Sequence, residues 1–141
     1  MFPARLLRAL ACAALLSASP LTAATFVVTS NADTAGSTCG SVCTLRQAIT
    51  AANATPAADT INFAITLPPR GEILIQPATQ LPIISQPLTI NGYSQSGTRV
   101  NDSAEASNAI LRIRIDGDLT PAGTSGLALC AASSQIRGLA I

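Results

Sequence analysis

The chain has no histidine and no tryptophan, and only one tyrosine and three phenylalanines among its 141 residues. Without histidine there is no imidazole for general base catalysis and no histidine ligand for zinc. Charged residues make up 11% of the chain, against about 25% in typical soluble domains. The eight basic residues are all arginines, and they do not cluster. Nucleic-acid binding is therefore not expected, because no basic patch could follow a phosphate backbone.

The N-terminal stretch has the pattern of a secretory signal peptide. Two arginines precede an apolar run over residues 9–18, and residues 22–24 ("TAA") supply small side chains for cleavage after Ala24. The apolar run is shorter than the roughly 20 residues that a bilayer-spanning helix needs, so no membrane span is expected in the mature chain. We therefore expect residues 1–24 to be a signal peptide and the protein to be secreted or held at the cell surface.

Three cysteines follow this leader, and an exported chain meets an oxidising compartment where disulfides persist. Cys39 and Cys43 enclose three residues, and Gly40 permits a tight turn, so a local disulfide is predicted. A redox-active pair would need two intervening residues, and a zinc site would need four ligands. Cys130 has no evident partner and is expected to be a small buried core residue.

One helix is predicted, over residues 44–53 ("TLRQAITAAN"), after a first strand at residues 25–30. Leu45, Ile49 and Ala52 fall on one face of this helix and form its expected core contacts.

Both ends of this helix carry local signals. Thr44 and Gln47 have the spacing of a capping box, in which the hydroxyl and the amide each satisfy a free backbone donor. Asn53 suits the left-handed position that ends a helix, and Pro56 forbids continuation.

Beyond residue 58 the pattern is β-rich, with Pro, Gly, Ser and Asn between short apolar segments. "TIN" recurs at residues 60–62 and 89–91, and Ile61, Ile90, Ile115 and Leu139 follow one another at irregular intervals of 24 to 29 residues. Such intervals indicate a repeat architecture. The predicted strands are 59–65, 71–76, 87–94, 110–118, 125–130 and 135–141.

These features predict a mainly β fold, a right-handed parallel β-helix capped by one short α-helix. The alternative is a β-sandwich, which would favour an aromatic core; here the apolar residues are mostly aliphatic and suit stacked ladders. Residues 25–58 would form the N-terminal strand and helical cap, and residues 59–141 the first coils. Because "SSQIRGLAI" stops inside a predicted strand, we expect the β-helix to be incomplete here and to continue in the C-terminal coils of a longer chain.

Residues 43–63 ("CTLRQAITAANATPAADTINF") resemble the CSLREA domain, a module named for its Cys-Ser-Leu-Arg-Glu-Ala motif. In exported bacterial proteins this module precedes right-handed β-helices of the pectin-lyase-like kind. Thr44 stands in place of Ser and Gln47 in place of Glu, and both replacements keep the capping chemistry. The matching residues are Cys43, Leu45, Arg46 and Ala48. The resemblance implies export and this architecture, but no common activity.

Candidate chemistry is confined to "LRIRIDGD", residues 111–118. The pattern predicts an exposed charged row, with Leu111, Ile113 and Ile115 turned to the core and Arg112, Arg114 and Asp116 outward. Related β-helix lyases use clustered carboxylates for calcium and an arginine as base, which would require Asp116 and Asp118 to meet carboxylates on a neighbouring coil. The repeat places Asn91 near Asp116, but the side chain of Asn91 is an amide and not a carboxylate. No catalytic, cofactor-binding or metal-binding residue is therefore assigned.

Arg46 lies beside Leu45 at the edge of the buried helix face. It is expected to pair with Asp33 or Asp59, or to donate to backbone carbonyls at the end of a coil. On this reading Arg46→Ala would be tolerated.

The sequence thus predicts an exported scaffold with a structural or surface-binding role, whose partners would be glycans or cell-surface proteins. The alternative is the N-terminal part of a polysaccharide lyase or hydrolase, with catalytic coils beyond residue 141.

Overall fold

The computed structural model describes residues 22–66, 68 and 71–141, so most of the predicted signal peptide lies outside the described residues. Its elements are one short α-helix, one 3₁₀ turn and seven strands. In chain order they are β1 (Thr25–Val28), α1 (Leu45–Ala52), β2 (Asp59–Phe63), β3 (Ile73–Ile75), β4 (Leu88–Asn91), η1 (Gly92–Ser94), β5 (Ile113–Ile115), β6 (Gln135–Arg137) and β7 (Leu139–Ala140).

The strands form two parallel sheets, with the orders β1-β2-β4-β6 and β3-β5-β7. From β2 onward the chain alternates between them, so that each winding of the chain gives one strand to each sheet. Every strand pairing in the described part of the chain is parallel, which is not the antiparallel pattern of a β-sandwich. The protein is therefore mainly parallel sheet with one short helix.

Identical residues stack between neighbouring windings. Thr60 pairs with Thr89, Ile61 with Ile90, and Asn62 with Asn91, as the recurrence of "TIN" predicts. Stacked aliphatic side chains form most of the core, and among the described residues Phe63 is the one aromatic side chain that is buried in it. Like side chains pack well at the strand spacing, because each covers the one next to it.

The predicted series does not continue as expected beyond Ile90. Ile90 pairs with Ile136, whereas Ile115 pairs with Ile75 in the other sheet. Asn91 therefore faces Arg137 in the register and not Asp116. The sequence-based prediction assigned one strand to each interval of 24 to 29 residues. In the structure, each winding of the chain contributes one strand to each of the two sheets.

Residues 125–130 do not form the predicted strand. Leu129 makes a single parallel bridge with Ile84, held by Ile84 N–H to Ala128 O and Cys130 N–H to Ile84 O. Pro82 lacks the backbone N–H that would extend this ladder by another bond. Cys130 is a free, exposed thiol, so its prediction as a buried core residue is wrong.

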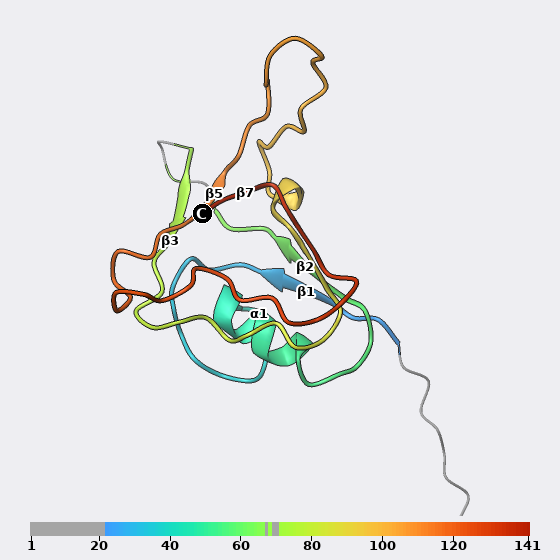
Figure 1. The fold of residues 1–141 in the computed structure, drawn as a ribbon, viewed down its shortest axis with the longest axis vertical. Helices are drawn as coiled ribbons and strands as arrows, with labels where there is room; N and C mark the ends of the chain where they lie inside the picture. Colours follow the sequence, from blue (N-terminus) through green and yellow to red (C-terminus); the bar gives the residue numbers. More distant parts are fainter. Residues whose placement is uncertain (1–21, 67, 69–70) are drawn as a thin grey trace, which may run out of the picture.

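The second winding carries a long excursion between β4 and β5. The antiparallel bridge between Arg99 and Ile110 closes its base, and the loop projects away from the sheets (Figure 1). Leu111 follows this bridge and is 39% exposed, so it does not join Ile113 in the core as predicted.

Candidate functional site

The helix α1 packs its apolar face against β1 and β2, at the β1 end of the four-stranded sheet (Figure 1). Its buried residues are Leu45, Ala48, Ile49 and Ala52, which includes all three predicted core positions. The capping box is confirmed: Thr44 Oγ1 accepts from Gln47 N–H at 3.3 Å, and Gln47 Oε1 accepts from Thr44 N–H at 3.0 Å. Local sequence signals therefore set where this helix begins and which face it buries.

The turn before the helix is closed by the predicted disulfide between Cys39 and Cys43. Cys43 is fully buried and its carbonyl accepts from Thr29 N–H and Ser30 N–H, just after β1. The hydroxyl of Thr29 in turn accepts from Cys43 N–H. The disulfide thus closes the turn, and the hydrogen bonds of Cys43 tie the start of the helix to the end of the first strand.

Asn53 ends the helix but not in the predicted left-handed conformation, since its φ is −67° and its ψ is −15°. Its side chain is engaged elsewhere, with Nδ2 donating to Ile83 O at 2.8 Å and Oδ1 accepting from Ser85 N–H at 2.9 Å. Asn53 keeps a right-handed backbone conformation while its side chain makes these two long-range hydrogen bonds. They take the place of the left-handed helix end that the sequence predicted.

The contacts of Asn53 belong to a larger set. Four polar side chains from the segment that contains β1 and α1 bind backbone groups of residues 74–85, which we call the first-winding edge. Asn31 Nδ2 donates to Leu74 O at 3.0 Å, and Asp33 Oδ2 accepts from Ala78 N–H at 2.9 Å. We call these four residues the capping side chains: Asn31, Asp33, Arg46 and Asn53.

Arg46 is the most connected of the capping side chains. Its Nη1 donates to Gln80 O and its Nη2 to Thr79 O, both at 2.8 Å. The same guanidinium pairs with Asp33 through two bonds, of 2.7 Å from Nε and 3.0 Å from Nη2. Of the predicted partners, Asp33 and the backbone carbonyls are thus confirmed, and Asp59 is not among them.

The Arg46–Asp33 pair is largely shielded from water, with side-chain exposures of 12% and 14%. Burial acts to raise the pKa of Asp33, but the hydrogen bonds from Arg46 and Ala78 N–H, together with the Arg46 charge, outweigh it and hold that pKa below its ordinary value. Asp33 is therefore a carboxylate at neutral pH and can hold both the guanidinium and the first-winding edge.

Sequence reasoning missed this set, although one signal was available. Arg46 and Asn53 are seven residues apart, so they lie on the same side of the helix, beside its apolar face. A row of polar side chains next to a buried face indicates a second contact surface. Its partner could not be read from the sequence, because the first-winding edge begins more than 20 residues after the helix ends.

The predicted charged row around β5 lines a pocket of about 360 Å³ with Arg114, Asp116 and Asp118, but no third carboxylate of the described residues joins these two aspartates to form a metal-binding group. Arg112 donates to Gly97 O and Gly71 O at 3.0 and 2.9 Å, so its guanidinium is engaged with backbone. Arg114 lies 3.7 Å from Glu72 and 3.8 Å from Asp116, and all these groups are partly exposed to water. Asp118 contributes its backbone N–H to Asp116 Oδ1.

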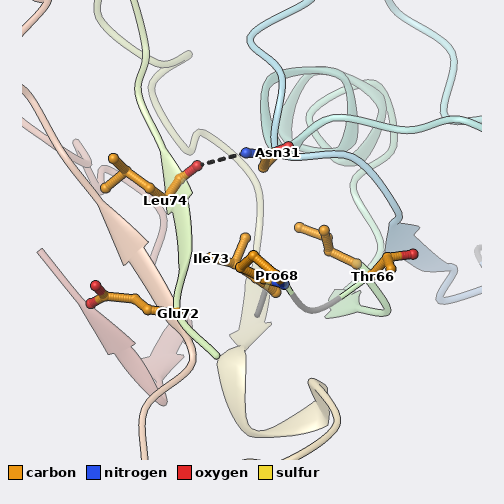
Figure 2. A pocket seen from close by; sticks show the side chains of 7 residues that line it. Asn31, Thr66, Pro68, Glu72, Ile73 and Leu74 are labelled. Carbon is orange, nitrogen blue, oxygen red and sulfur yellow. Dashed lines mark hydrogen bonds between the residues drawn. The ribbon is translucent and has the colours of Figure 1, made fainter. Parts of the chain in front are cut away.

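A cleft of about 250 Å³ lies between the segment after β2 and strand β3. Figure 2 shows Ile73 turned towards Pro68, whereas Glu72 and Leu74 point away; Asn31 bonds the Leu74 carbonyl beside it. The cleft is smaller than the ligand pockets of about 300–1,000 Å³ that are usual in proteins. Glu72 is the one charged residue among the described residues that line it, and Figure 2 shows its side chain pointing away.

Within residues 22–66, 68 and 71–141, no group of three His, Cys, Asp or Glu side chains is placed to hold a metal ion. In the same part of the chain, no helix has the length and apolar character needed to cross a membrane. Comparison of the chain with protein-family models, curated proteins and solved structures finds no match.

Proposed function

We propose that residues 25–58 are the N-terminal cap of a right-handed parallel β-helix, and that the protein is an exported scaffold of the cell surface. One observation carries this proposal: the four capping side chains bind backbone groups along a single winding. An open end of a stack of parallel strands exposes unpaired N–H and C=O groups and invites pairing with other chains. Repeat architectures accordingly require a polar terminal cap.

The alternation of strands between two parallel sheets supports the β-helix assignment. Connections between parallel strands of one sheet are almost always right-handed, which favours that hand here. The resemblance of residues 43–63 to the CSLREA domain points the same way, since in that family the module precedes such a β-helix. Arg46 of the motif then serves the cap, by joining the helix to the backbone of the first winding.

Export rests on the leader pattern and on the disulfide at the cap. A structural role agrees with the geometry better than catalysis does, because the capping side chains are engaged with backbone groups and with one another. Glycans and cell-surface proteins are the proposed contacts of the exposed scaffold.

The proposal is tested by expressing residues 1–141 in a Gram-negative bacterium and separating the periplasm, medium and cytoplasm. We expect a processed, disulfide-bonded protein outside the cytoplasm. Full-length chain confined to the cytoplasm would contradict export.

The cap is tested with Arg46→Ala combined with Asn53→Ala, which should raise the oligomeric fraction in light scattering above that of the wild type. Arg114→Ala combined with Arg137→Ala should leave that fraction unchanged. An oligomeric fraction equal to that of the wild type in the cap variant would contradict the capping role.

A further inference from the structure

Asp59 is a buried carboxylate that the cap does not use. It lies at the start of β2 and is 1% exposed. Oδ1 accepts from the backbone N–H of Ala24 at 2.6 Å, and Oδ2 accepts from the Thr55 hydroxyl at 2.7 Å. Among the described residues, no arginine lies within ion-pair distance of it. A buried carboxylate without a countercharge is unfavourable, even where hydrogen bonds satisfy its oxygens.

The nitrogen nearest to this carboxylate sits at the end of the predicted leader. Cleavage after Ala24, which the small residues at 22–24 favour, would remove the donor to Asp59 Oδ1. It would also remove Ala24 O, which accepts from Thr60 N–H at 2.9 Å and begins the pairing of β1 with β2. Cleavage one bond earlier keeps both contacts and still leaves a small residue, Ala23, at the end of the leader, with Leu21 in place of Thr22 two residues before the cut residue.

We propose that the leader is cut between Ala23 and Ala24, and that the new α-ammonium group of Ala24 forms an ion pair with Asp59. This inference rests on the export proposed above. In the cut, which the host's signal peptidase would catalyse, water adds across the peptide bond. Ala23 leaves as a carboxylate, and the nitrogen of Ala24 becomes an ammonium group.

The ion pair completes the environment of Asp59. One N–H of the ammonium group points to Oδ1, where the amide N–H lies in the uncut chain, and half-buried Ala24 leaves its other hydrogens within reach of water. Processing thereby supplies the countercharge that the fold itself lacks at this carboxylate. The mature N-terminus would lock β1 against β2 at the edge of the four-stranded sheet.

The cleavage site is tested by N-terminal sequencing of the protein recovered outside the cytoplasm. The expected start is Ala-Thr-Phe-Val. A start at Thr25 (Thr-Phe-Val-Val), or at any other residue, would overturn the inference while leaving export intact. Failure to leave the cytoplasm would instead contradict the proposed function, so the two failures are distinguishable.

The ion pair is tested by amine chemistry on the exported protein. The chain contains no lysine, so the α-amine is its one primary amine, and an acetylating reagent modifies it selectively once the exposed Cys130 thiol has been blocked in all samples. Acetylation restores an amide N–H like that of the uncut chain and removes only the charge, whereas reductive dimethylation keeps the charge and one N–H. We expect acetylation to lower the Tm by about 5 °C, and dimethylation to change it far less.

An Asp59→Asn variant provides the matched control. If it folds, acetylation should leave its Tm unchanged, because the partner charge is gone. If it does not fold, the comparison of acetylated with dimethylated wild-type protein still decides. Equal Tm values for those two forms would overturn the ion pair.

Discussion

At the scale of the residue, Arg46 has a role that its sequence position understates. From its place beside the buried helix face, Arg46 was expected to make either an ion pair or backbone hydrogen bonds, and its replacement by alanine was expected to be tolerated. In the fold its guanidinium makes four hydrogen bonds, two to the Asp33 carboxylate and two to backbone carbonyls. Removing one partner of a shielded ion pair leaves the other charge without compensation.

Arg46→Ala is therefore expected to lower the free energy of unfolding by about 2–3 kcal/mol. This differs from the expectation from the sequence, which was that the substitution would be tolerated. Asp33 would lose its countercharge, and two carbonyls of the first-winding edge would lose their donors. Urea denaturation measures the change. Arg114→Ala is the control, because its ion pairs are long and exposed, and it should stay within about 0.5 kcal/mol of wild type. Equal effects of the two substitutions would contradict this account.

The pH dependence of the same pair follows from the direction of the Asp33 shift. Its folded pKa lies below the unfolded value of about 3.9, so the stabilisation is fully present above that pH and is lost as the pH falls through the folded pKa. The difference in unfolding free energy between wild type and Asp33→Asn should be largest near pH 6 and shrink below about pH 4. Denaturant titrations at pH 6, 4 and 3 check this, and a constant difference would rule it out.

At the level of single elements, α1 shows which features of a helix can be predicted from residues that are close together in the sequence. The capping box and the apolar face were both readable, and the helix ends within a residue of the predicted position. Thr44 does more than the box requires, since its hydroxyl also donates to Thr34 O at 2.8 Å and the residue is buried. The start of the helix is thereby joined to the loop that carries Asp33.

Thr44→Ala should lower the free energy of unfolding by about 1–2 kcal/mol, because one hydroxyl serves both the helix cap and the loop. Thr44→Ser keeps the hydroxyl and should change stability by less than half as much. Thermal unfolding of the two variants, followed by circular dichroism, makes the comparison. Equal losses would show that the methyl group, and not the hydroxyl, is what matters at this position.

At the scale of the whole molecule, successive windings approach each other closely enough to exclude side chains. A Cβ placed on Gly92, the first residue of η1, would overlap the backbone carbonyl of Gly138 and come within 2.7 Å of the Leu139 side chain. Backbone atoms cannot yield as a flexible side chain can, so the last winding depends on this glycine.

Gly92→Ala should therefore destabilise the protein by about 2–3 kcal/mol or more and release β6 and β7 from the stack first. Hydrogen exchange measured by mass spectrometry should show faster exchange at residues 135–140 than in wild type. Gly117→Ala is the control, since a Cβ there meets only the Thr120 hydroxyl at an ordinary 3.5 Å. Unchanged exchange in Gly92→Ala would show that the windings are less closely held than the geometry indicates.

Four local features could be predicted from the amino-acid sequence: the disulfide, the capping box, the buried helix face and the pairing of the two "TIN" segments. Each depends on residues close together in the chain or on a direct repeat. Cys130 and Leu111 were misplaced because an apolar context does not show whether another winding covers a side chain.

Three features became visible only in the folded chain: the sheet that Ile115 joins, the binding of Asn53 and Arg46 to the first-winding edge, and the donation from Ala24 to Asp59. These contacts join segments about 30 or more residues apart, and no periodic pattern encodes them. These contacts satisfy backbone groups and a carboxylate that become buried only when the windings stack. The side chains that bind them are the ones that packing brings within hydrogen-bond distance.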